Sequence, residues 1–159
     1  MAEPRTRRRW LAPAVFAVVV PGLHSAQQAH VSAQLMMAIL CNEAYKPHDA
    51  AFGIANMHRV TFDEVKKSRD FAGRRWDELP DDRDLAIEAE AWYLHDLAEQ
   101  LPPTWHGSLS KDELLALGYN TGASNMLAFA RGATPGSQAQ SYLNRLHTNR
   151  AKAGKVVGG

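Results

Sequence analysis

Glu43 is the residue of this chain best placed for acid–base chemistry, because it closes an apolar run. Residues Leu35 to Cys41 are apolar without a break, so a helix over this stretch is expected to be buried. Pro47 biases Lys46 away from helical geometry, which predicts that the helix ends close to Glu43. Burial and the negative end of the helix dipole both disfavour a charged carboxylate. The position predicts either a general acid held protonated near neutral pH or a helix-end glutamate that simply reaches water.

Two further segments carry polar and aromatic residues that a helical core does not require. Residues 52–57 hold a glycine followed by the amide of Asn56, and residues 118–122 hold the pair Tyr119 and Asn120 between two glycines. Taken singly, a turn and a helix C-terminal cap would explain them. Their order and spacing behind the buried glutamate make them candidate parts of one site.

The elements that must position these residues are predicted to be helical, which gives an all-α fold class. Helix-start signals stand at Ser32, at Asp81 or Asp82, and in the capping boxes Thr61–Glu64 and Ser110–Glu113. The predicted helices span about 21–29, 32–43, 61–69, 83–100, 110–119, 124–129 and from 137 past 146. Residues 46–58 are predicted to form a loop without strands, and the tail at 149–159 is predicted to be disordered.

The first twenty residues allow more than one interpretation. A cluster of arginines at 7–9 precedes an apolar run at 10–20, which is typical of a signal peptide, a twin-arginine export signal or an anchor. The run is short and is interrupted by Pro13, so a first packing helix is an equal alternative. Residues 21–148 are predicted to form a single domain.

Composition excludes several classes of site. The chain has 159 residues and a formal net charge of +1, so its bulk electrostatics do not require a nucleic-acid partner. The acidic stretch at 77–99 is interpreted as a solvated helix face. Cys41 is the single cysteine and lies in the apolar run, where a free thiol is expected to fill the core. The histidines show no metal-ligand spacing, so neither a metal nor a cofactor is predicted.

Taken together, the segments resemble the catalytic domain of the soluble-type lytic transglycosylases and the related goose-type lysozymes. Glu43–Pro47 stands where this family has a Glu-Ser pair followed by an aromatic residue and Asn-Pro. Gly53–Asn56 matches its Gly-Leu-Met-Gln motif, and Gly118–Gly122 matches its Ala-Tyr-Asn-Ala-Gly motif. Its motif Asn-Ile-x-x-Gly-x-x-Tyr-Leu is matched loosely by Leu85–Leu94. The resemblance covers about residues 21–148 and implies a lysozyme-like fold.

The resemblance implies cleavage of the peptidoglycan glycan strand between N-acetylmuramic acid and N-acetylglucosamine. Glu43 takes the place of the catalytic glutamate, which serves as acid and then as base and leaves a 1,6-anhydro end. The places of substrate-binding residues are taken by Tyr45, Asn56, Tyr119 and Asn120. No second carboxylate is evidently paired with the acid, and Asp49 is the nearest candidate. This lone-acid scheme departs from the two-carboxylate scheme of most glycosidases.

Four positions depart from the family pattern and keep alternatives open. They are Ala44 in place of Ser, Asn56 in place of Gln, and Gly118 and Thr121 in place of Ala. The alternatives to a transglycosylase are a lysozyme-type hydrolase that uses water, and a non-catalytic wall-binding module of a secretion apparatus or phage tail. A nucleic-acid binder is disfavoured, because the basic ends of the chain lack interleaved aromatic residues apart from Trp10.

The implied partner is the peptidoglycan strand, so an extracytoplasmic location is expected. Membrane association through residues 1–20 is one option, and the oligomeric state is not predicted. Among the tryptophans, Trp105 follows Pro102 and Pro103 in a loop and is the best candidate for a wall of the substrate cleft.

Overall fold

The computed structural model describes residues 21–43 and 51–157, and this part of the chain is mainly helical. The predicted all-α fold class is therefore confirmed. The predicted signal, anchor or first helix at 1–20 lies outside the described residues, as do Ala44, Tyr45 and Asp49. Within the described ranges, no helix is long and apolar enough to cross a bilayer.

The helices begin mostly where local capping chemistry predicts. Residues 21–29 form the first described helix. It is followed by α2 (Ala33–Glu43), the strands β1 (Ala51–Phe52) and β2 (Met57–His58), α3 (Arg59–Val65), the 3-10 turn η1 (Trp76–Glu78), α4 (Arg83–Gln100), α5 (Lys111–Thr121), α6 (Ala123–Ala130) and α7 (Ser137–Val157). The predicted caps of α2, α4 and α5 are present as side-chain acceptors at Ser32, Asp82 and Ser110. These acceptors satisfy backbone N–H groups that have no partner within the helix.

Two predictions for the segment before α4 are wrong. Residues 51–58 are not all loop, because β1 and β2 pair antiparallel in a two-stranded hairpin. The strands are too short for an alternation of apolar and polar residues to reveal them. β2 leads directly into α3, which begins at Arg59. Thr61 therefore lies inside the first turn, and the predicted capping box does not start the helix.

The C-terminal tail and Cys41 also differ from their predictions. Residues 149–157 belong to α7 and are helical. This end of the helix packs on α2, where Gln34 donates a hydrogen bond from Nε2 to the carbonyl of Arg150 over 2.8 Å. A tertiary contact therefore overrides the weak helix signal of the tail. Cys41 is exposed and does not fill the core, although most of the apolar run around it is buried.

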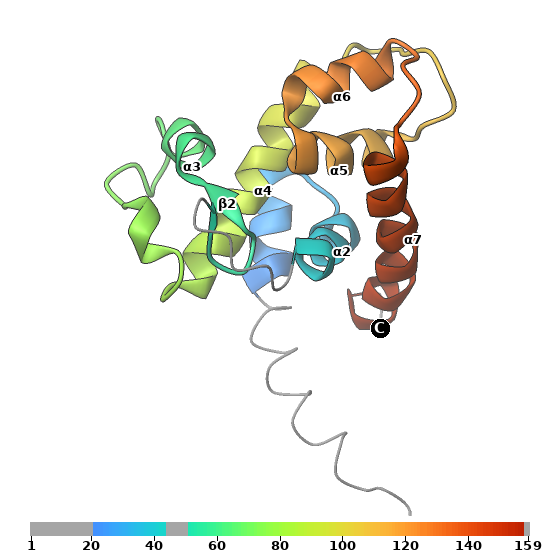
Figure 1. The fold of residues 1–159 in the computed structure, drawn as a ribbon. Helices are drawn as coiled ribbons and strands as arrows, with labels where there is room; N and C mark the ends of the chain where they lie inside the picture. The colour runs from blue at the N-terminus through green and yellow to red at the C-terminus, as the bar shows by residue number, and fades with distance from the viewer. Residues whose placement is uncertain (1–20, 44–50, 158–159) are drawn as a thin grey trace, which may run out of the picture.

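The position of α2 between the hairpin and α7 defines the candidate site (Figure 1). α7 runs alongside α2, α5 packs on α6, and α4 contacts α3, α5 and α6. One buried core joins Ile39 of α2, Leu94 of α4, Leu114 of α5 and Tyr142 of α7. The end of α2 is thus a point at which segments far apart in the sequence meet.

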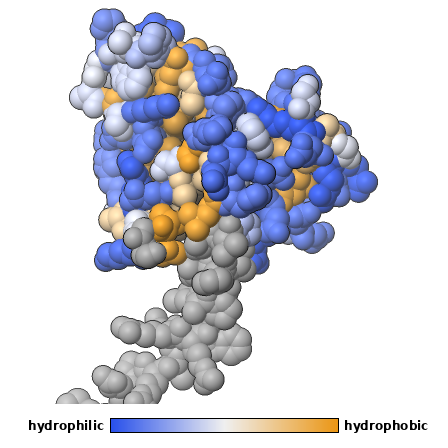
Figure 2. All heavy atoms as spheres, turned by 180° about the vertical axis from the view of Figure 1, so that it is seen from behind, coloured by the Kyte–Doolittle hydropathy of each residue, from blue (hydrophilic) through white to orange (hydrophobic). Residues whose placement is uncertain are grey.

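Three large apolar side chains are exposed in the described part of the chain. Val60 is 77% exposed, and Leu23 and Val156 are 41% and 42% exposed. Seen from behind, the surface is mainly polar, and apolar residues emerge as a narrow band between polar flanks (Figure 2). Scattered exposed hydrophobic residues of this kind are normal for a globular protein.

The hairpin turn depends on Gly53, the residue that follows β1. Its φ is +76°, a conformation that side chains other than glycine rarely adopt. A Cβ added at this position would lie 3.0 Å from the carbonyl oxygen of Leu79 and 3.1 Å from its Cβ. Both the backbone conformation and the available space therefore require glycine.

We expect Gly53→Ala to lower the free energy of unfolding by about 1–3 kcal/mol, through backbone strain and overpacking against Leu79. Chemical denaturation followed by tryptophan fluorescence measures it, since Trp76 stacks on Phe52 of the hairpin at 3.8 Å. Gly73→Ala is the matched control, because nothing lies within 4 Å of a Cβ built there. Equal stability of the two variants would show that the turn does not need glycine.

Candidate active site

Glu43 is the last described residue of α2, and its carboxylate is held by two side chains from other parts of the chain. Asn56 donates a hydrogen bond from Nδ2 to Oε2 over 3.2 Å. Tyr142 donates from its hydroxyl to Oε1 over 2.9 Å. The residue is 9% exposed, so it is mostly shielded from water. Each carboxylate oxygen therefore accepts from a neutral donor in a largely desolvated setting.

Asn56 reaches Glu43 because the hairpin turn holds it in a left-handed conformation. Its φ is +50°, and its backbone N–H donates to the carbonyl of Gly53 over 3.1 Å. Asparagine tolerates this conformation better than most residues with a side chain. This tolerance gives a physical reason for Asn56 where the resembled motif has Gln. Asn56 was predicted to bind substrate, and in the structure its amide contacts the acid.

Tyr119 forms a hydrogen bond to the hairpin turn that carries Asn56. Its hydroxyl donates to the carbonyl of Ala55 over 2.7 Å, and its ring packs on that of Tyr93 at 5.3 Å. The adjoining Asn120 is exposed and makes no side-chain hydrogen bond to the described residues. The structure therefore brings Tyr119 to the turn that carries Asn56, whereas it does not bring Asn120 to the acid. The predicted contact of Tyr45 lies outside the described residues.

A polar clamp joins the end of α2 to α7. Asn42, which is buried, donates from Nδ2 to the carbonyl of Tyr142 over 3.1 Å. Its side-chain oxygen accepts from Nδ2 of Asn149 over 2.6 Å. The clamp fixes the register of the two helices, and thereby places the Tyr142 hydroxyl on Glu43. Sequence reasoning did not identify Tyr142 or Asn149 as parts of the site.

Tyr142 stays a hydrogen-bond donor over the whole neutral range. Burial raises the pKa of its hydroxyl far above the ordinary value, and the negative charge and hydrogen bond of Glu43 raise it further. A tyrosine that holds its proton can stabilise a carboxylate without competing for the charge. Burial is also the largest of the causes that raise the pKa of the Tyr119 hydroxyl.

Glu90 of α4 is a second carboxyl group close to the site, and its burial is complete. It is 0% exposed, and neither carboxylate oxygen has a hydrogen-bond partner among the described residues. The solvated face predicted for residues 77–99 is therefore wrong at this position. Glu90 lies four residues before Leu94 and seven before Leu97 on the apolar stripe of the helix, and this helical periodicity could have located it.

Glu90 also lies within the segment that loosely matches the fourth motif of the resembled family. With Tyr93 and Leu94 aligned to the end of Asn-Ile-x-x-Gly-x-x-Tyr-Leu, Glu90 occupies the glycine position. Burial raises the pKa of the Glu90 carboxyl well above its ordinary value, and the charge of Glu43 raises it further. Both effects favour the neutral form of this carboxyl group. Glu90 is a second carboxyl group whose charge is felt at Glu43, but it forms no hydrogen bond with the described residues, and full burial keeps it away from any substrate.

The raised pKa of Glu90 makes stability depend on pH. The unfolded chain loses this proton near pH 4.3, whereas the folded chain keeps it to higher pH. The contribution of Glu90 to the free energy of unfolding is fully present below the unfolded pKa. It is lost as pH rises toward the folded pKa, by up to about 1.4 kcal/mol per pH unit. Glu90→Gln mimics the neutral acid and removes this loss. We expect the stability gain of Glu90→Gln over the parent to grow from pH 5 to pH 8 in denaturant titrations.

Glu99→Gln on the same helix is the control, because Glu99 is exposed. It should shift the stability by a small amount with little dependence on pH. A stability difference between Glu90→Gln and the parent that stays constant across this range would mean that Glu90 ionises alike in the folded and unfolded chain.

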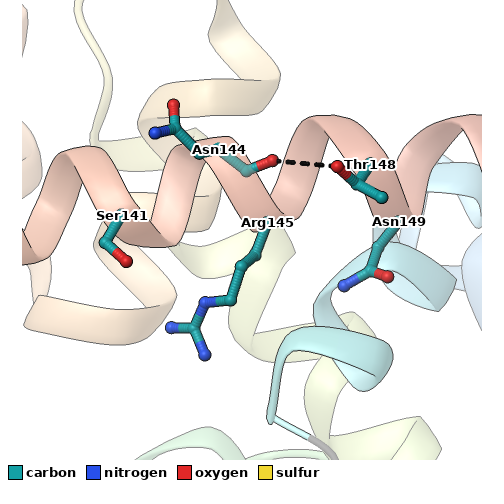
Figure 3. Close-up of a pocket in the computed structure, with 5 residues that line it drawn as sticks. All are labelled: Ser141, Asn144, Arg145, Thr148 and Asn149. Carbon is teal, nitrogen blue, oxygen red and sulfur yellow. Dashed lines mark hydrogen bonds between the residues drawn. The ribbon is translucent and has the colours of Figure 1, made fainter.

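A polar hollow of about 440 Å³ lies along α7 (Figure 3). It is lined by Ser141, Asn144, Arg145, Thr148 and Asn149. Asn149 links this hollow to α2 through its hydrogen bond to Asn42. Trp105, the predicted cleft wall, instead donates from Nε1 to the carbonyl of Leu109 and packs against the core.

Among the residues that the structure describes, no group of three or more His, Cys, Asp or Glu side chains could hold a metal ion. Comparisons with protein-family models, curated proteins and solved structures find no match to this chain. The likeness to the lytic transglycosylases therefore rests on the sequence motifs alone. The arrangement itself offers one largely buried carboxyl group whose two oxygens accept hydrogen bonds from neutral donors.

Proposed function

We propose that the chain cleaves the glycan strand of peptidoglycan as a lytic transglycosylase of lysozyme-like fold, with Glu43 as its acid and base. The observation that carries the proposal is the buried carboxyl of Glu43, whose two oxygens accept hydrogen bonds from Asn56 and Tyr142. The motif order supports the substrate class. A peptidoglycan substrate requires the enzyme to act outside the cytoplasm.

The proposed reaction needs one proton donor that later becomes a proton acceptor. Glu43 protonates the glycosidic oxygen, and the bond from that oxygen to C1 of the muramic residue breaks. The carboxylate then removes the proton from the C6 hydroxyl, whose oxygen bonds to C1 and closes the 1,6-anhydro ring. Glu43 recovers its proton, and no water is consumed.

The hydrogen bonds at Glu43 suit the first of these steps. As the proton leaves, negative charge develops on the carboxylate, and the donors Asn56 and Tyr142 already point at its two oxygens. Donors arranged before the reaction stabilise charge without reorganisation. Full burial keeps the Glu90 carboxyl away from a substrate and favours its neutral form, so it is not placed to act as a nucleophile. A single acid–base residue is thus the chemistry that the described carboxyl groups support best.

Glu43→Gln tests the proposal, because it keeps the size of the side chain and removes its exchangeable proton. We expect release of soluble fragments from purified peptidoglycan sacculi to fall by at least about a hundredfold, the typical contribution of a general acid. Mass spectrometry of the parent's products should show 1,6-anhydro ends, whereas reducing ends would indicate a hydrolase.

Glu99→Gln is the control for that assay and should release fragments at the parent rate. Equal release by Glu43→Gln and the parent would overturn the assignment of the acid. If the folded parent pellets with sacculi and releases nothing, a non-catalytic wall-binding module replaces the proposed enzyme.

Tyr142→Phe removes one of the two donors while keeping the ring in the core. A hydrogen bond to a charged group contributes about 1.5–3 kcal/mol, so we expect the cleavage rate to fall roughly ten- to a hundredfold. Tyr93→Phe is the control, since the Tyr93 hydroxyl makes only a 3.5 Å contact to the carbonyl of Gly118. Rates that fall equally in both variants would mean that the loss comes from general destabilisation of the core.

A further inference from the structure

Two side-chain contacts fasten α7 to the first turn of α5. Nε2 of His147 lies 2.7 Å from Oε1 of Glu113, and the guanidinium of Arg150 lies 2.9 Å from a carboxylate oxygen of Asp112. The two α7 residues are three positions apart and therefore share one face of that helix. The two carboxylates lie in the N-terminal turn of α5, where the helix dipole favours negative charge. α7 is thus held on α5 by a double contact, in addition to its packing on α2 (Figure 1).

Glu113 is fixed in place by the cap of its own helix. Its Oε2 accepts a hydrogen bond of 2.8 Å from the backbone N–H of Ser110, and its own N–H donates to the Ser110 hydroxyl over 3.2 Å. The other carboxylate oxygen is thereby presented to His147. Partial burial raises the pKa of the Glu113 carboxyl, but the hydrogen bonds from Ser110 and His147 outweigh it and hold that pKa below the ordinary value. Glu113 therefore remains charged in mildly acidic solution.

The two contacts respond differently to pH. A guanidinium keeps its charge at any pH near neutrality, so the contact between Arg150 and Asp112 remains an ion pair. An imidazole ordinarily gains or loses its proton between about pH 5 and pH 8, and the His147 side chain is 54% exposed, so solvent reaches it. A hydrogen bond to a carboxylate is stronger when its donor is also charged. The contact between His147 and Glu113 is therefore strongest when the imidazole carries its proton.

Glu113 is the group through which protonation of His147 acts. The ionisable residues on the helices packed against α7 are Lys111, Asp112, Glu113 and Tyr119 on α5, and Cys41 and Glu43 on α2. Of these, Glu113 alone forms a hydrogen bond or ion pair with His147. On α7 itself, the like charge of Arg150 is compensated by Asp112. The titration of His147 therefore changes one contact between α5 and α7 and leaves the other in place.

The same part of α7 carries the donors on which the end of α2 depends. Asn149 lies between the two contact residues in sequence and donates to the side chain of Asn42. Tyr142 lies five residues before His147 and donates to Glu43. Loosening of α7 from α5 therefore also loosens these donors. How firmly α7 is docked thus affects the hydrogen bonding of Glu43.

We propose that the contact between His147 and Glu113 is a pH-sensitive latch, which holds α7 on α5 more firmly in mildly acidic than in mildly alkaline solution. Both partners carry charge between the ordinary values of the two groups, about pH 4.3 for a glutamate and about pH 6.5 for a histidine. As pH rises through the histidine range, the latch loses its ion pair. Because the pKa of Glu113 is lowered, its own contribution is lost only as pH falls below about 4.3. The latch acts whether or not the chain cleaves glycan strands.

Hydrogen exchange of the full chain, followed by mass spectrometry, measures how firmly α7 is docked. The readout is the protection factor of α7 peptides at about pH 5.5 and about pH 8, which removes the pH dependence of intrinsic exchange. His147→Gln should lower this protection roughly twofold to fivefold at the acidic pH, the range expected for a solvent-exposed ion pair, and leave it nearly unchanged at the alkaline pH. Glu113→Gln keeps a capping side chain without its charge, so it should abolish the same pH dependence.

Arg150→Gln is the matched control on the same helix face, because it removes an ion pair that does not titrate in this range. It should lower the protection alike at both pH values. His106→Gln should change neither value, since His106 is exposed and its side chain forms no hydrogen bond with the described residues. A loss in His147→Gln that is equal at the two pH values, or absent at both, would overturn the latch. Failure of the chain to cleave sacculi would overturn the proposed reaction and leave the latch standing.

Discussion

Buried polar groups must find partners inside the protein, and the end of α2 is where this constraint shapes the structure most. Asn42 and Glu43 both carry polar side chains into the core at the end of an apolar helix. The partners of Asn42 come from α7, and those of Glu43 come from α7 and the hairpin. If α7 shifted along α2, these groups would lose their partners at a cost of about 1–3 kcal/mol each. The need to satisfy them sets the helix register.

The two buried carboxyl groups illustrate opposite solutions to the same problem. Glu43 has two neutral hydrogen-bond donors and a small exposed surface. Glu90 has neither donors nor exposure, so its neutral form is favoured. A buried carboxyl that stays neutral limits the negative charge that gathers near the acid.

Local patterns predicted the helices and the burial of Glu43, because caps and apolar runs act over a few residues. The apolar run predicted the burial of Glu43, and the caps at Asp82 and Ser110 predicted the long helices. The hairpin was missed because its strands have two residues each. Tyr142 carries no local signal of its role, since its partner lies 99 residues earlier. Glu90 did carry a local signal, because it lies on the apolar stripe of its helix. The many acidic residues around it favoured the interpretation of a solvated face instead.

The long separation between Glu43 and Tyr142 has a consequence for the order in which the chain becomes competent. All the segments that carry the family-like motifs precede α7, yet the acid receives its second donor only when α7 docks. A chain made or translocated from its N-terminus therefore assembles the candidate site last. Cleavage of the backbone before α7 would leave every motif in place and still remove the Tyr142 donor from Glu43. The complete hydrogen bonding of Glu43 is thus a property of the completed fold.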